Sequence, residues 1–179
     1  YGARANIMWC GTIAHNGTCG VGCEEDWASH FLEHEVSAIY NVTHGAGLSV
    51  IVPAWMTFMA GHNPKKIARF ANRVFGVPES EDLEEMALAG VSRLKHFFRF
   101  IGLPVNFKEL GIENPDIDRL ADSLHRNKGE FVGNYVKLTK QDSKESLPSG
   151  TVINKKNGEV FYLTSPFLLF DFDFFLHVN

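Results

Sequence analysis

Residues 26–47 read DWASHFLEHEVSAIYNVTHGAG and carry three histidines, His30, His34 and His44. Apolar side chains recur at helical spacing over residues 24–40, with acids in the first turn, so we expect an amphipathic helix here. His30 and His34 are four residues apart and would share one face of that helix. The helix therefore presents two imidazoles to one side.

The third histidine sets a geometric condition. On one continuous helix His30 and His44 would lie about 21 Å apart, at about 1.5 Å per residue. They can lie side by side only if the helix ends soon after residues 37–38 and the chain doubles back through residues 40–43. Asn41 suits such a reversal, because asparagine is common in turns.

The remainder of residues 1–142 has the same helical character. Pro53 lies inside an apolar stretch and indicates a buried helix that is kinked or starts there. Gly76 ends one helix, Asn114 is expected to cap another, and Thr139 to cap a last short one. The further helical stretches are 3–17, 47–61, 63–76, 79–104 and 114–129. The pattern predicts an all-α fold, a helical bundle.

The chain changes character at residues 143–179. An Asn-Gly pair at 157–158 lies between β-forming residues and predicts a hairpin turn. Residues 166–176 read PFLLFDFDFFL, an aggregation-prone run. We therefore divide the chain into a helical domain, 1–142, and an atypical β-like tail, 143–179, which we hypothesise is not native to the domain.

The composition describes one globular domain of 179 residues, 45% hydrophobic, with a net charge of −4. An acidic chain argues against a nucleic acid or an anionic membrane as partner. The three cysteines form no CxxC pair, and no signal peptide or membrane span is visible, which favours the cytoplasm. Cys19 and Cys23 have no second pair to complete a zinc site, so we expect none there.

One interpretation of His30-Phe-Leu-Glu-His34 is an HxxEH zinc metallopeptidase, in which both histidines hold zinc and Glu33 activates water. Such enzymes need a downstream glutamate, and Glu109 lies 75 residues after His34. A glutamate near that position arises often by chance, and those enzymes have a mixed α/β fold. The predicted helices disfavour this alternative.

Several separated motifs point elsewhere. ARANIMW, DWASH and HGAGLSVIVPAWM occur in that order and are followed by RFANRVFGV, FFRFIGLPVNFKELGI and GEFVGNYVKLT. Together they resemble the iron-containing alcohol dehydrogenases, in particular their butanol dehydrogenase-type branch. The resemblance runs from Tyr1 to about Asp142 and implies the dehydroquinate synthase-like, helical C-terminal domain of that family.

The resemblance also implies a site. His30 and His44 match two ligands of a divalent metal, Fe²⁺ or Zn²⁺, while His34 matches a non-ligand on the active-site side that relays a proton. The implied reaction moves hydride between NAD(P)H and a small alcohol or aldehyde. We expect Glu33 and Glu35 to be surface groups or supports behind the ligands.

The family's dinucleotide-binding half has no counterpart here. The sequence contains no strand–GxGxxG–helix unit, and no Asp-x-x-x-His pair for the other metal ligands. We therefore expect the C-terminal piece of a longer enzyme, inactive alone, with the cofactor bound mainly by a missing N-terminal domain. The other alternative is a non-catalytic helical remnant that self-associates, and a homo-oligomer is expected in either case.

Overall fold

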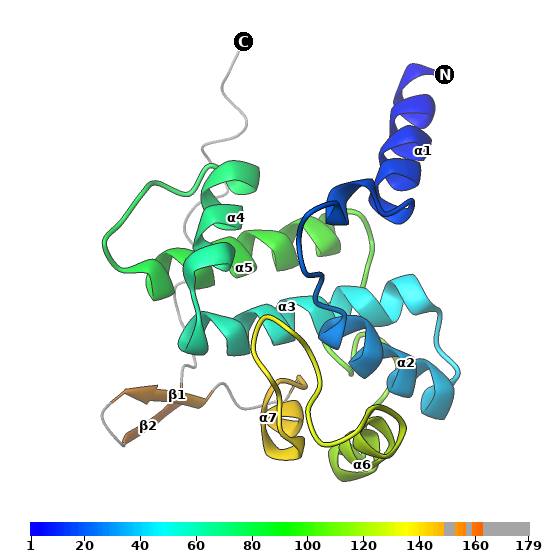
Figure 1. The fold of residues 1–179 in the computed structure, drawn as a ribbon, viewed down its shortest axis with the longest axis vertical. Helices are drawn as coiled ribbons and strands as arrows, with labels where there is room; N and C mark the ends of the chain where they lie inside the picture. Colours follow the sequence, from blue (N-terminus) through cyan, green and yellow to red (C-terminus); the bar gives the residue numbers. More distant parts are fainter. Residues whose placement is uncertain (149–152, 157–158, 163–179) are drawn as a thin grey trace. The chain divides into compact units, whose positions relative to one another are not determined.

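Helix follows helix through the first 148 residues of the computed structural model, which describes residues 1–148, 153–156 and 159–162 (Figure 1). The chain divides into two units, Tyr1–Pro148 and Ser149–Asn179. The elements of the first are α1 Gly2–His15, the 3₁₀ turn η1 Thr18–Gly20, α2 Ala28–Tyr40, α3 His44–His62, α4 Lys65–Phe75, α5 Leu83–Phe100, α6 Ile117–Lys128 and α7 Lys140–Glu145. This unit confirms the all-α prediction.

Helix α3 is the central element, packed against α2, α4 and α5 (Figure 1). Its buried side chains include Val50, Ile51 and Met59, each 0% exposed. The helix continues through Pro53, so it does not start there. Within the described part of the chain, no helix is both long and apolar enough to cross a bilayer.

Helices α4 and α5 pack closely because glycine and alanine meet between them. A Cβ placed on Gly90 would lie 2.8 Å from the Cα of Ala71, so only glycine allows this approach. Helix α4 ends at Gly76 in a left-handed conformation, φ 63°, as predicted. Asp82 caps α5 by accepting from the Glu85 N–H at 2.9 Å.

Helices α6 and α7 pack together and extend the helical unit beyond residue 142. The predicted cap Asn114 is wrong: Asp116 caps α6 and accepts from the Arg119 N–H at 3.0 Å. A capping side chain accepts from an N–H group two or three residues further along the chain, and the Arg119 N–H is too far along from Asn114. Thr139 caps α7 in a capping box, as predicted. Leu147 is buried, and the first unit ends at Pro148.

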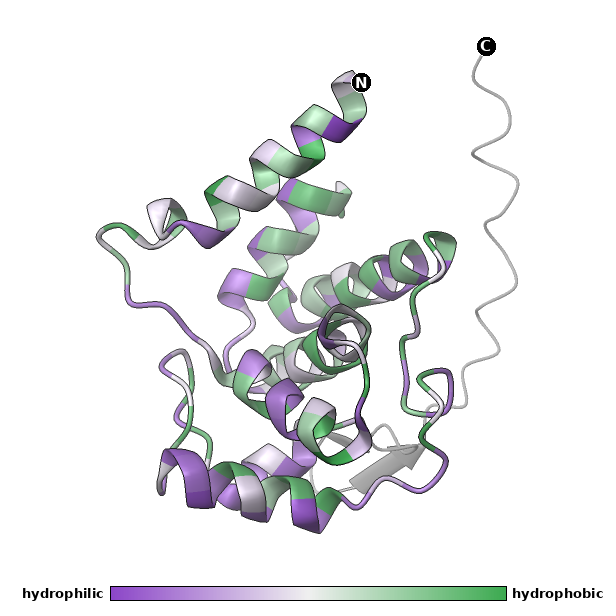
Figure 2. Cartoon of the chain, turned by 90° about the vertical axis from the view of Figure 1, so that its right-hand side faces the viewer, coloured by the Kyte–Doolittle hydropathy of each residue, from purple (hydrophilic) through white to green (hydrophobic). Residues whose placement is uncertain are grey.

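Helix α1 differs from the others because none of its side chains is buried. Its exposed apolar side chains include Ile7, Met8 and Trp9, which are 73%, 75% and 66% exposed. In Figure 2 this helix projects from the unit and carries hydrophobic segments along its length. Its neighbour in the unit is η1.

The second unit contains an antiparallel hairpin of β1 Ile153–Lys156 and β2 Glu159–Tyr162. Lys156 pairs with Glu159, so the pairing confirms the predicted strands. The Asn-Gly pair at 157–158 and the apolar run at 166–176 lie outside the described residues.

Candidate metal centre

The candidate site lies where α2 turns into α3. Helix α2 ends at Tyr40, and Asn41 takes a left-handed conformation, φ 52°, with its N–H donating to the Ser37 carbonyl at 2.9 Å. Asparagine adopts this conformation more readily than most residues. Helix α3 begins at His44. The chain therefore reverses where the sequence predicted, and His44 returns to the α2 face.

The reversal brings three imidazoles together. The ring centroids of His30 and His44 lie 5.7 Å apart, as the distance argument required. The ring of His34 is also close, 5.2 Å from that of His44, and belongs to the same cluster. His34 and His44 are exposed, whereas His30 is half-buried and its ring meets that of Trp27 edge to face, with the ring centroids 5.0 Å apart.

Burial lowers the pKa of His30, and the neighbouring imidazoles of His44 and His34 lower it further, while Glu33 opposes them. His30 therefore stays neutral at neutral pH and keeps a nitrogen lone pair for a metal ion.

Glu33 is the buried carboxylate of the site. This side chain is 0% exposed, contacts Nδ1 of His44 and accepts a hydrogen bond from the Ser37 hydroxyl. Ligand atoms of Glu33, His34 and His44 all lie within 4.8 Å of one another, close enough to contact one metal ion. It is the one such group found in the described residues, and His30 is not part of it.

The expected surface position of Glu33 and Glu35 is wrong. Glu35 is 7% exposed and accepts from the side-chain amide of Asn127 on α6 at 2.9 Å. Both carboxylates are held by hydrogen bonds across helices or within α2, which offset the loss of water. Only the second expectation, a support behind a ligand, fits Glu33.

Glu109, the third ligand of the peptidase alternative, has other partners. It accepts from Arg99 Nη2 at 2.9 Å and from the Val105 N–H at 2.9 Å. The hydrogen bond from Arg99 lowers the pKa of Glu109. It is absent from the metal-binding group found in the described chain, as are Cys19 and Cys23. The peptidase ligand set is therefore not assembled there.

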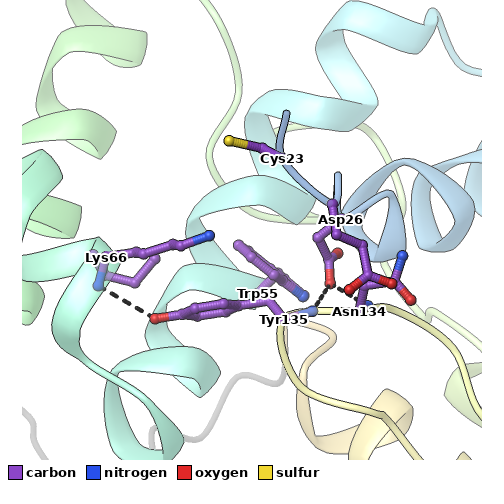
Figure 3. A pocket seen from close by; sticks show the side chains of 8 residues that line it. Cys23, Asp26, Trp55, Lys66, Asn134 and Tyr135 are labelled. Carbon is purple, nitrogen blue, oxygen red and sulfur yellow. Dashed lines mark hydrogen bonds between the residues drawn. The ribbon is translucent and has the colours of Figure 1, made fainter. Parts of the chain in front are cut away.

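A separate pocket of about 420 Å³ opens beside the start of α2 (Figure 3). Asp26 accepts from the backbone N–H groups of Asn134 and Tyr135, each at 2.7 Å, and ties the α6–α7 loop to α2. The Tyr135 hydroxyl donates to the Asn63 carbonyl at 2.6 Å. Trp55 also lines the pocket, but the three histidines do not. The polar groups here serve packing of the loop.

Two further residues hold the Glu33 carboxylate where α2 turns into α3, Ser37 and Gly47, and neither was among the residues predicted for the site. A Cβ on Gly47 would lie 2.9 Å from Cδ of Glu33, so this glycine makes room for the carboxylate. The spacing of four between Glu33 and Ser37 was the available signal for their contact. Gly47 carried no comparable local signal.

Comparison with known proteins gives one consistent result. A sequence model for the Fe-containing alcohol dehydrogenase family, C-terminal, matches residues 1–149. The probable NADH-dependent butanol dehydrogenase 1 of Bacillus subtilis is 38% identical over 79% of this chain and 36% of its own length. The NADPH-dependent aldehyde reductase of Escherichia coli is 32% identical over 78% of this chain and 36% of its own.

A solved structure extends the likeness to the fold. The NADH-dependent butanol dehydrogenase A of Thermotoga maritima superposes with a TM-score of 0.74 at 39% identity. The match covers 82% of this chain and 38% of that one. The present chain thus spans little more than a third of the length of these relatives.

Proposed function

The chain belongs to the Fe-containing alcohol dehydrogenase family, and from this premise we propose that it forms the C-terminal, metal-holding domain of an NAD(P)H-dependent alcohol dehydrogenase or aldehyde reductase. The observation that carries the proposal is the meeting of His30, His34 and His44 where α2 turns into α3. The names of the relatives support a small alcohol or aldehyde of the butanol type as substrate.

The donor set fits Fe²⁺ or Zn²⁺, because imidazole nitrogen suits both ions. We assign His30 and His44 as ligands. His44 has Nδ1 against Glu33, which leaves Nε2 as its donor. Catalytic metals usually have at least three protein ligands. The remaining ligands would therefore come from the dinucleotide-binding domain.

The chemistry divides between the bound groups and the protein. When bound, the metal supplies Lewis acidity to the alcohol or carbonyl oxygen, and NAD(P)H supplies the hydride. His34 is exposed and one turn beyond His30, so its imidazole can take the hydroxyl proton at a ring nitrogen and pass it to water. In the reverse direction the same nitrogen returns the proton.

A chimera tests the proposal. Residues 1–148 would replace the matching region of the Bacillus subtilis relative, which restores a dinucleotide-binding domain. We expect NAD(P)H oxidation with butyraldehyde, lost in His30→Ala and in His44→Ala. A folded chimera that lacks activity, or one that keeps it in both variants, would contradict the assignment.

The isolated chain provides the second test. We expect it to bind Co²⁺ only weakly, where Co²⁺ serves as a spectroscopic substitute for Fe²⁺ or Zn²⁺. We also expect no NAD(P)H oxidation with butyraldehyde. Tight stoichiometric metal binding together with turnover would show that this chain needs no further domain.

We also propose that the chain forms a homo-oligomer through α1. The supporting observation is the exposure of Ile7, Met8 and Trp9, which are apolar side chains without buried contacts. Exposed apolar area favours association because its burial releases water. The partner in this proposal is a second copy of the chain.

A further inference from the structure

We infer that Glu33 is a positioning residue that selects which ring nitrogen of His44 faces the metal. The inference rests on the proposed function, because it assumes that His44 is a ligand. Its ground is the contact between the buried carboxylate of Glu33 and Nδ1 of His44, whose imidazole is exposed.

The chemistry of the two groups sets the direction of that hydrogen bond. An ionised carboxylate only accepts, so Nδ1 of His44 must carry the proton and donate it. A neutral imidazole with its proton on Nδ1 has its lone pair on Nε2. Glu33 thereby turns Nε2 of His44 outward as the metal donor. Carboxylates that hold a histidine in this way also raise its basicity as a ligand.

The surroundings of Glu33 hold the carboxylate in one place. Its side chain is 0% exposed, and one oxygen accepts from the Ser37 hydroxyl one turn later on α2. From the other side, Gly47 in the first turn of α3 leaves the space that a Cβ would fill. The positive end of the α3 dipole favours an anion here. Both helices therefore contribute to the position of Glu33.

Glu35 shows what a buried glutamate does without this role. It lies two residues further along α2, is 7% exposed and binds Asn127 on α6. Glu33 and Glu35 share helix, charge and burial but differ in their partners. Glu35→Gln is therefore a matched control for Glu33→Gln.

The decisive measurement is the tautomer of His44 in the metal-free chain. Two-bond ¹H–¹⁵N spectra, recorded about two pH units above the ordinary imidazole pKa, distinguish a proton on Nδ1 from one on Nε2. We expect the Nδ1–H form in the wild type and a shift toward Nε2–H in Glu33→Gln, since glutamine can also donate. Glu35→Gln should leave the spectrum of His44 unchanged.

Two results would overturn the inference: an Nε2–H tautomer of His44 in the wild type, or the same Nδ1–H tautomer in Glu33→Gln. Should Glu33→Gln fail to fold, Ser37→Ala removes one contact of the carboxylate and leaves its charge. We expect a smaller shift of the same sign there, and an unchanged tautomer in that variant would count against the inference.

Co²⁺ titration separates this inference from the proposed function. We expect Glu33→Gln to weaken Co²⁺ binding about 10- to 100-fold and Glu35→Gln to leave it unchanged. If neither the wild-type chain nor the chimera bound Co²⁺ while the tautomer shift remained, the metal function would fail. The orienting role of Glu33 would still be supported.

Discussion

Helices α1 and α2 have nearly the same length, 14 and 13 residues, and both have apolar side chains at helical spacing. In α2, Leu32, Glu33 and Val36 are buried against neighbouring helices, whereas α1 buries no side chain. Apolar spacing therefore predicts that a segment is helical, but it does not predict which other helix packs against it. A site that needs precise side-chain positions can be built on α2, because packing holds that helix on several sides.

The largest expected effect is on the rate of butyraldehyde reduction, for a substitution where α2 turns into α3. In the chimera, we expect His44→Ala to lower butyraldehyde reduction by at least about 100-fold, because it removes an assigned ligand. His62→Ala, at the far end of the same helix, should leave the rate within about twofold of the wild type. The His62 ring forms a hydrogen bond with the Phe58 carbonyl and is not an assigned ligand. Equal losses in both variants would mean that the effect comes from α3 as a whole.

The next effect is on the free energy of unfolding. Leu32 of α2 is 1% exposed, so Leu32→Ala should lower that free energy by about 2–5 kcal/mol through lost packing. Ile7 of α1 is 73% exposed, and Ile7→Ala should change it by less than about 0.5 kcal/mol. Urea unfolding followed by circular dichroism gives both values. A comparable loss in Ile7→Ala would show that α1 is packed in solution.

Association is the third property to compare. We expect Ile7→Glu and Met8→Glu to lower the average mass of the chain in light scattering, because a charge at a buried contact is costly. Arg69→Glu, on the exposed face of α4, is the control and should leave the mass unchanged. An oligomer that persists in both α1 variants would place the interface elsewhere.

The smallest expected effect is at the ends of the two helices. Asn41 follows α2 at φ 52°, so Asn41→Ala should cost about 1 kcal/mol of unfolding free energy, while Asn41→Gly should cost less. Asn16 follows α1 at φ −93°, an ordinary value, so Asn16→Ala loses only an exposed hydrogen bond from the Thr18 N–H and should cost clearly less than Asn41→Ala. A cost at Asn16 matching that at Asn41 would contradict the argument from backbone conformation.

Much of the fold followed from local signals. The helices were predicted from apolar spacing, and Gly76 and Thr139 mark helix boundaries because their local conformations suit those positions. The cap of α6 was misplaced at Asn114, because two acceptors stand close together and the sequence alone did not decide between them. The buried position of Glu33 and Glu35 was also missed, since glutamate is rarely buried without partners.

The sequence by itself set the condition under which His30 and His44 can approach each other, which is that α2 ends between them. Fourteen residues on one helix span too far, and Asn41 permits the left-handed turn that ends α2, so the reversal is a local event. Only the tertiary structure decided that Glu33 lies buried beneath His44 while His34 stays exposed. Whether a side chain is buried depends on which residues of another helix pack against it. Here Gly47 on α3 leaves the space that the Glu33 side chain occupies.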